Sequence, residues 1–111
     1  HWALDAAKVL AAEDIEVEVI DLRTLLPWDK ETVLASVRRT AKVLVLHEAP
    51  LTGGFGGEVA ATISQEAFDS FDAPVPRFGG SDTPIPFAEA LEEMLSPKPD
   101  LLPTLRRLLE Y

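Results

Sequence analysis

Residues 44–58 read LVLHEAPLTGGFGGE, which is an apolar run, a His-Glu pair and a loop that contains four glycines. The apolar run predicts a buried strand, because a strand covered on both faces has no polar side to show. A helix-like pattern begins after the loop. A strand, a glycine loop and a helix in this order form the ligand crevice of open α/β sheets. The stretch therefore predicts an α/β fold and raises the question of whether the loop holds a phosphate.

Outside this stretch, helical and strand patterns alternate along the chain. Helices between strands imply right-handed crossovers, so we expect a three-layer α/β/α fold with a mainly parallel sheet. Residues 1–111 should form a single domain. The expected elements are a helix at 1–13, a strand at 16–25, a helix after Asp29, a strand at 42–49, a helix at 59–67, a strand at 75–78, a turn at 79–86, a helix at 87–95 and a last helix capped by Asp100 or a neighbour.

Two of these elements carry local signals. Asp29 is a good N-cap, since its carboxylate can accept bonds from the free amides of the first turn. Trp28 precedes it and can pack onto Val33 as a hydrophobic staple. Pro76 lies inside the strand at 75–78, which predicts a sheet edge because proline donates no hydrogen bond. The buried face of the helix after Asp29 is expected to contain Val33, Leu34, Val37 and Ala41.

Composition limits the classes of function. The chain has 111 residues, of which 47% are apolar, and this supports one hydrophobic core and argues against disorder. The formal charge of -9 argues against a nucleic-acid partner and suits a basic protein partner or simply solubility. No apolar run approaches the ~20 residues needed to cross a bilayer. Disulfides and thiolate metal sites are excluded because there is no cysteine, and two histidines do not support a His-rich zinc site.

The glycine loop does not match the phosphate-binding fingerprints. A dinucleotide loop requires G-x-G-x-x-G, and the third glycine is missing after Gly54 and Gly56. Glu58 falls in the first turn of the helix, where its charge would repel a phosphate, and no Walker A ending follows. We expect instead that Gly53, Gly54 and Gly56 let a tight loop cross a neighbouring subunit or helix, with Phe55 buried as an anchor.

His47 and Glu48 lie at the carboxyl end of the buried strand, where α/β enzymes often place catalytic groups. None of the serines belongs to a recognisable catalytic motif, and no metal set or paired carboxylate accompanies the pair, so we assign no catalytic, cofactor-binding or metal-binding residue. A structural His bonded to the backbone or to a carboxylate is the prediction, with a catalytic His as the alternative. Asp82, Pro84 and Pro86 belong to a rigid, locally bonded turn, which we interpret as a packing or contact loop.

Four motifs together resemble one known family. They are VIDLRTLLPWD at 19–29, HEAPLTGGFG at 47–56, DAP at 72–74 and DTPIP at 82–86. Over nearly its whole length the chain is similar to the C-terminal, transketolase C-terminal-like domain of the E1 β-subunits of 2-oxo acid dehydrogenase complexes. The HEAPLTGGF form most resembles the branched-chain, or 2-oxoisovalerate, type.

The resemblance implies an oxidoreductase that decarboxylates a 2-oxo acid on thiamine diphosphate with Mg²⁺ and passes the acyl group to a lipoyl arm of E2. The cofactor would lie between the E1 α-subunit and the β-subunit's N-terminal domain, so none is expected on this domain. The implied partners are the E1 α-subunit, a second β-subunit and, in some members, the basic peripheral subunit-binding domain of E2. Asp72 and the terminal carboxylate of Tyr111 match the docking positions, where opposed charges would speed association.

The family pattern has a strand and a glycine ahead of the first helix, and we expect this chain to be a fragment that starts after them, with an exposed sheet edge. Residues 87–103 match the family only loosely. Two alternatives stay open: a pyruvate dehydrogenase E1 β-subunit, and a free-standing nucleotide-binding α/β domain that uses the loop Gly53–Gly57. The implied location is the cytoplasm in a bacterium or archaeon and the mitochondrial matrix in a eukaryote, with the cytoplasm favoured and no membrane association.

Overall fold

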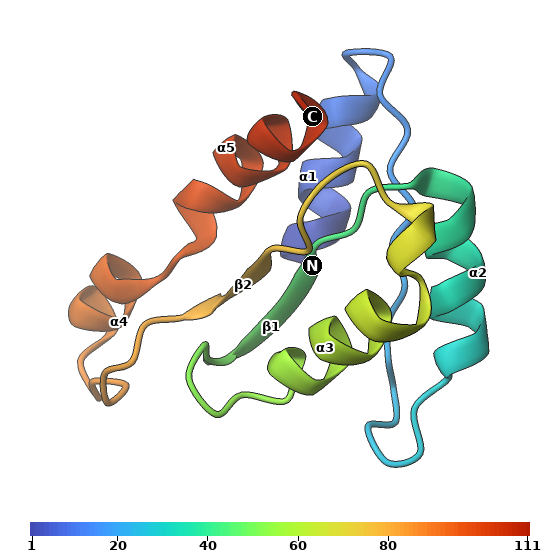
Figure 1. The fold of residues 1–111 in the computed structure, drawn as a ribbon. Coiled ribbons are helices and arrows are strands. Elements are labelled where there is room, and N and C mark those ends of the chain that lie inside the picture. Colours follow the sequence, from blue (N-terminus) through green and yellow to red (C-terminus); the bar gives the residue numbers. More distant parts are fainter.

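The structure of the protein, a computed structural model, describes all residues from 1 to 111. Two strands, separated by α3, lie between pairs of helices along the chain (Figure 1). None of the helices combines the length and the apolar character that crossing a bilayer requires. The elements are α1 (Trp2–Ala11), α2 (Lys30–Thr40), β1 (Val45–Pro50), α3 (Gly56–Glu66), the 3-10 helix η1 (Phe68–Ser70), β2 (Arg77–Gly80), α4 (Glu89–Leu95) and α5 (Lys98–Leu109).

The two strands pair in parallel. Leu46 lies opposite Phe78, and after a register shift Pro50 lies opposite Gly80. Parallel pairing requires a crossover connection, and α3 supplies it between β1 and β2. The parallel sheet predicted from the order of the elements is confirmed. Both strands end at the same side of the sheet, which we call the carboxyl edge, and both begin at the opposite side, the amino edge.

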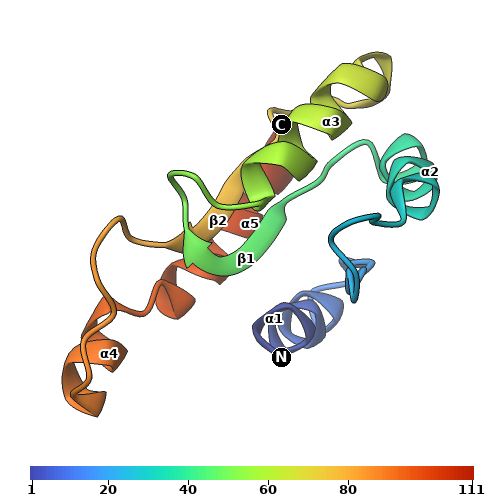
Figure 2. The same cartoon turned by 90° about the horizontal axis from the view of Figure 1, so that it is seen from below.

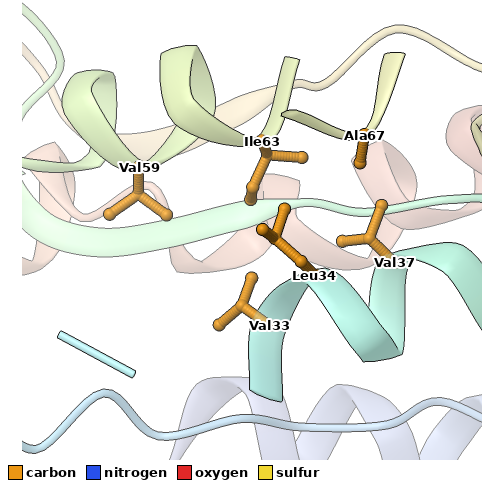
Figure 3. Packing of buried hydrophobic residues seen from close by; sticks show 6 residues of the cluster. All are labelled: Val33, Leu34, Val37, Val59, Ile63 and Ala67. Atoms are coloured by element: carbon orange, nitrogen blue, oxygen red, sulfur yellow. The ribbon is translucent and has the colours of Figure 1, made fainter. Parts of the chain in front are cut away.

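Helices cover both faces of this sheet, so the predicted three-layer α/β/α fold is confirmed. α2 and α3 pack on one face, and their buried side chains form the larger core (Figure 3). α1 and α5 lie on the other face, where Ala6 and Leu101 pack against Phe78 of β2. Seen from below, β1 passes between α1 and α3 (Figure 2). The larger core contains Val33, Leu34, Val37, Val59, Ile63 and Ala67.

Side chains of β1 and the residue before it alternate between the two cores. Val45 packs against the α2–α3 core, whereas Leu44 and Leu46 pack against the α1–α5 core. Successive side chains of a strand point to opposite faces. His47 therefore lies on the α3 side and Glu48 on the α1 side, although the two are neighbours in sequence.

α2 begins at the predicted cap. The carboxylate of Asp29 accepts hydrogen bonds from the hydroxyl of Thr32 at 2.7 Å and from its amide at 3.1 Å. These two bonds lower the pKa of Asp29, the hydroxyl bond having the larger effect. Trp28 packs against the α2–α3 core, in agreement with a hydrophobic staple. The expectation for Ala41 is wrong, because this residue lies just beyond the helix in a left-handed conformation with φ 59°.

The prediction of a strand at residues 16–25 is wrong. This segment runs between α1 and α2, and neither β1 nor β2 pairs with it. A strand forms only where a neighbour receives its backbone hydrogen bonds. The apolar residues that suggested it, such as Ile20 and Leu22, instead pack against the α2–α3 core. Glu18 binds the hydroxyl of Ser36 and the guanidinium of Arg39, so side chains rather than backbone pairing hold the segment.

β2 also differs from its expected position, because it ends at Gly80 rather than at residue 78. Two glycines that were expected in a turn extend the strand, since the amide of Leu51 donates to the carbonyl of Gly80 at 3.1 Å. Pro76 lies just before the strand, and its carbonyl accepts a bond from the amide of Val45 at 3.0 Å. Pro76 contributes only its carbonyl oxygen as an acceptor there, so the absence of an amide hydrogen removes no hydrogen bond between the two strands.

The two C-terminal helices are present as predicted but start at different residues. α4 begins at Glu89 and buries none of its residues. α5 begins at Lys98, with Pro99 in the first turn, where an amide would have no partner inside the helix. Asp100 therefore lies within the first turn and is not the cap.

Candidate functional site at the ends of the strands

Three glycines surround the imidazole of His47. A Cβ atom at Gly54 would stand 2.4 Å from Cε1 of the ring, and one at Gly56 would stand 2.5 Å from Cδ2. From the neighbouring strand, a Cβ at Gly79 would lie 3.0 Å from Nε2. The first two distances are too short for non-bonded atoms, so positions 54 and 56 have no room for a larger residue. We call the space that these three glycines enclose the His47 cradle.

Both ring nitrogens of His47 are buried, and neither hydrogen-bonds to another group of the chain. The predicted bond to the backbone or to a carboxylate is therefore wrong for this chain. The physical reason lies in the cradle, because glycine has no side chain that could donate to or accept from the ring. Leaving a buried polar atom without a partner costs about 1–3 kcal/mol, which makes His47 an energetically demanding residue.

Gly54 and Gly56 of the glycine loop make room for His47 of the same chain. That the loop also crosses a neighbouring subunit or helix stays a prediction. Phe55 packs against the α2–α3 core, as expected for an anchor, although it is only half-buried. Gly53 has φ 73° and no neighbour near its Cβ position. It is required for the turn of the loop, because side chains disfavour that conformation.

The loop is tied to the end of β2 by polar contacts. The carboxylate of Asp82 accepts a bond from the amide of Thr52 at 3.0 Å and a second from the hydroxyl of Thr52. Arg77 donates to the carbonyl of Leu51 at 2.8 Å. The pKa of Asp82 is lowered, first by the hydroxyl bond of Thr52, then by its amide bond and by the charge of Arg77. The prediction of local bonding is therefore wrong for the carboxylate of Asp82, which bonds across the carboxyl edge to a residue 30 positions earlier.

A cavity of about 370 Å³ lies at the carboxyl edge between the strand ends and α4. Pro84 and Pro86 of the predicted contact loop line it, together with Glu48. His47 does not, since it points to the opposite face of β1. A His-Glu pair acting on one substrate is therefore ruled out by the alternation of the strand. The structure also contains no group of three or more His, Cys, Asp or Glu residues that could hold a metal ion.

Asp72 and Tyr111 lie at the amino edge. The amide of Asp72 donates to the carbonyl of Ala41 at 3.0 Å, and both residues precede a strand. The ammonium of Lys42 donates to the carbonyl of Leu109 at 3.3 Å, which brings the end of α5 to the same edge. The side chains of Asp72 and Tyr111 are both exposed. Two residues far apart in sequence therefore share one edge, opposite to the cavity.

A comparison with protein families identifies the fold. Residues 1–102 match the family model described as Transketolase, C-terminal domain. The chain belongs to this family. The transketolase C-terminal-like fold expected from the four motifs is thus confirmed.

Relatives of this transketolase C-terminal domain include both kinds of dehydrogenase subunit. It is 49% identical over 98 residues to the 2-oxoisovalerate dehydrogenase subunit beta 2, mitochondrial, of Arabidopsis thaliana, which covers 88% of this chain and 25% of that protein. It is 39% identical over 110 residues to the pyruvate dehydrogenase E1 component subunit beta of Rickettsia felis, which covers 98% and 34%. The chain thus spans about a quarter to a third of the length of these relatives.

A solved structure described as a split gene transketolase, inactive beta4 tetramer, has the same fold. It matches with a TM-score of 0.76 and 35% identity over 98% of this chain and 34% of that chain. The relatives include mitochondrial and bacterial proteins, so they leave the compartment of this transketolase C-terminal domain open.

Some residues of the site were missed in the sequence. Gly79 was assigned to a turn, although a glycine inside a strand often marks a close approach, and this signal pointed to the cradle. Thr52 was not recognised as the partner of Asp82 because 30 residues separate the two. The three glutamates of α4 that line the cavity, Glu89, Glu92 and Glu93, were also missed, since glutamates on a short helix usually face solvent.

Proposed function

We propose that this chain is the C-terminal assembly and partner-docking domain of the E1 β-subunit of a thiamine diphosphate-dependent 2-oxo acid dehydrogenase. The complete enzyme would oxidatively decarboxylate a branched-chain 2-oxo acid and transfer the acyl group to lipoyl-E2. Membership of the transketolase C-terminal domain family and the names of the relatives support this proposal. The 49% identity to a 2-oxoisovalerate dehydrogenase subunit favours the branched-chain type. The pyruvate type is the second candidate, because a subunit of that name matches over 98% of the chain.

The observation that carries the docking role is the amino edge. Asp72 and the end of α5 gather there through contacts with the adjacent residues Ala41 and Lys42. The exposed carboxylate of Asp72 would give that edge a negative group, with Tyr111 near it, on a chain of net charge -9. The basic peripheral subunit-binding domain of E2 is the partner with complementary charge. The E1 α-subunit and a second β-subunit would cover other surfaces.

The cofactor of the complete enzyme does not fit the residues of this domain. The imidazole of His47 fills the space between Gly54 and Gly56, where a diphosphate would have to approach the loop. Glu58 lies in the first turn of α3 and would repel a phosphate. We therefore propose that thiamine diphosphate and Mg²⁺ are held elsewhere in the complete enzyme. The same two observations disfavour the nucleotide-binding alternative, and a rise in melting temperature with NAD or ATP would reinstate it.

Docking can be tested by calorimetric titration of the chain with an E2 peripheral subunit-binding domain. Asp72→Asn should weaken binding, whereas Asp69→Asn, an equal change of charge at an exposed residue of η1, should leave it within about twofold. Raising the salt concentration from 50 to 500 mM should also weaken binding, because screening acts on exposed charges. An affinity that changes neither with the salt concentration nor in Asp72→Asn would contradict the docking role.

The reaction can be tested separately. The chain alone, mixed with thiamine diphosphate, Mg²⁺ and 3-methyl-2-oxobutanoate, should release no carbon dioxide, and measurable turnover would refute an assembly role. The complete β-subunit with its α-subunit should decarboxylate 3-methyl-2-oxobutanoate faster than pyruvate. The reverse preference would assign the enzyme to the pyruvate type and leave the docking role unaffected.

A further inference from the structure

The cavity at the carboxyl edge has an acidic wall with no cation of its own. Glu48 reaches it from the end of β1, and α4 adds further carboxylates. None of these glutamates forms an ion pair within the chain, and no lysine or arginine lines the cavity. The glutamates that line it are Glu48, Glu89, Glu92 and Glu93.

Three large apolar side chains also line the cavity, and exposed apolar side chains continue onto its rim. Trp2, Ile85 and Leu95 line the interior. Ile85 is 66% exposed and Met94 of α4 is 79% exposed, so large apolar side chains face water next to the cavity. α4 packs its side chains into neither of the two cores. Its ribbon lies on the opposite side of the fold from α2 (Figure 1). Apolar surface gathered in this way typically marks an interaction site.

The chemistry of the walls defines the occupant. A metal ion is a poor match, because no three of the acidic side chains converge closely enough to hold one. An anion would meet four carboxylates and no lysine or arginine. A cationic side chain meets the charge requirement, and its apolar stem meets the tryptophan, isoleucine and leucine of the interior. A polypeptide with apolar residues beside that cation would at the same time cover the exposed side chains of α4.

We propose that this cavity, walled by the strand ends and α4, docks a basic amphipathic polypeptide segment that inserts an arginine or lysine side chain among the four glutamates. The partner lays its apolar residues on Ile85 and Met94. This surface lies at the carboxyl edge, opposite to Asp72 and Tyr111, so it is a second contact and does not depend on docking at the amino edge.

The test is a titration of the ¹⁵N-labelled chain with the peptide acetyl-Leu-Arg-Leu-Leu-Arg-Leu-amide, followed by NMR. We expect chemical-shift changes at the indole of Trp2 and at the amides of Gly80 and Ser81, which all line the cavity. A matched peptide with citrulline in place of arginine keeps the shape and removes the charge. It should bind at least fivefold more weakly, and 500 mM salt should weaken the arginine peptide similarly.

Two double variants separate this cavity from the general acidity of the chain. Glu92→Gln with Glu93→Gln should weaken the arginine peptide about three- to tenfold, as expected for two exposed charges. Glu16→Gln with Glu31→Gln makes the same change of charge at exposed residues far from the cavity and should stay within twofold. The spectra themselves report whether each variant is folded.

Any of three results with the peptides and double variants would overturn the inference, and a fourth concerns the amino edge. The three are no shift at millimolar peptide, equal binding of the citrulline peptide, and equal weakening by the two double variants. Shifts at the amino edge that disappear in Asp72→Asn would also overturn it. That last outcome would at the same time support the docking role proposed for Asp72, so the two proposals can fail separately.

Discussion

Gly79 on β2 lies directly against the imidazole of His47 on β1, so that a Cβ at this glycine would stand 3.0 Å from Nε2. The parallel pairing of the two strands brings the residues together across 32 positions of sequence (79 − 47). Together with the contacts of Gly54 and Gly56, this contact shows that the glycine loop encloses a side chain of its own protein.

The His47 cradle predicts that a single methyl group added at one of its glycines destabilises the fold. Gly56→Ala should lower the free energy of unfolding by about 1–3 kcal/mol, because the added carbon overlaps the ring of His47. Urea denaturation measures this directly. Gly57→Ala is the matched control, since its Cβ would meet only the flexible end of Arg77, and it should be neutral or slightly stabilising.

A double variant tests whether His47 is the cause. In a His47→Ala background, Gly56→Ala should cost less than it does alone, which gives a coupling energy of about 0.5–3 kcal/mol for residues in contact. Strict additivity of the two changes would show that the glycine is needed for another reason.

Asp82 predicts a stability that depends on acid pH. Its pKa is lowered in the folded chain by the two bonds from Thr52, so the folded state takes up the proton only at lower pH than the unfolded chain does. The stabilisation is present above the ordinary value of 3.8 and is lost as the pH falls through the lower value of the folded state. Asp82→Asn should therefore flatten the decline of stability below about pH 4, as measured by urea unfolding at several pH values.

Thr52→Val should act in the same direction as Asp82→Asn, because it removes the hydroxyl bond, which has the largest effect on this pKa. Asp69→Asn is the control, since its carboxylate takes part in none of the side-chain hydrogen bonds of the chain. Glu18 and Asp29 also have lowered pKa values, so part of the acid dependence should remain in every variant. A Thr52→Val profile that coincides with that of the unaltered chain would rule out the bond to Asp82.

The α2–α3 core should be the part most sensitive to a loss of volume. Ile63 is 1% exposed between the two helices, and Ile63→Ala should cost about 2–5 kcal/mol in thermal or urea unfolding. Met94→Ala on the exposed face of α4 should change stability by less than about 0.5 kcal/mol. Similar losses at the two positions would mean that α4 packs on the body of the chain.

The segment at 16–25 should exchange its amide hydrogens quickly. The amides of Val17 and Val19 take part in no backbone hydrogen bond, whereas the amides of Val45 and Leu51 donate to Pro76 and Gly80 across the sheet. Exchange followed by NMR should therefore show strong protection at Val45 and Leu51 and none at Val17 and Val19. Protection at residues 17 and 19 would mean that the segment pairs with a strand after all.

The local features of the chain could be predicted from the sequence because each depends on a few neighbouring residues. Asp29 caps α2 through Thr32, which lies three positions later, and the buried stripe of α3 follows helical spacing. The apolar run before His47 identified β1. These features and the order of helices and strands were sufficient for the α/β class and, through the four motifs, for the transketolase C-terminal domain family.

The remaining features depend on tertiary contacts and could not be predicted from local sequence patterns. An extended apolar segment becomes a strand only beside a partner, so residues 16–25 and the two glycines that end β2 were assigned wrongly. The cradle, the bond from Thr52 to Asp82 and the acidic cavity each join residues that are distant in sequence, and periodicity carries no information about such pairs. The sequence alone determined the class and family through local patterns, whereas the contents of the glycine loop were decided by tertiary packing, because only the paired strands bring His47 and Gly79 into contact.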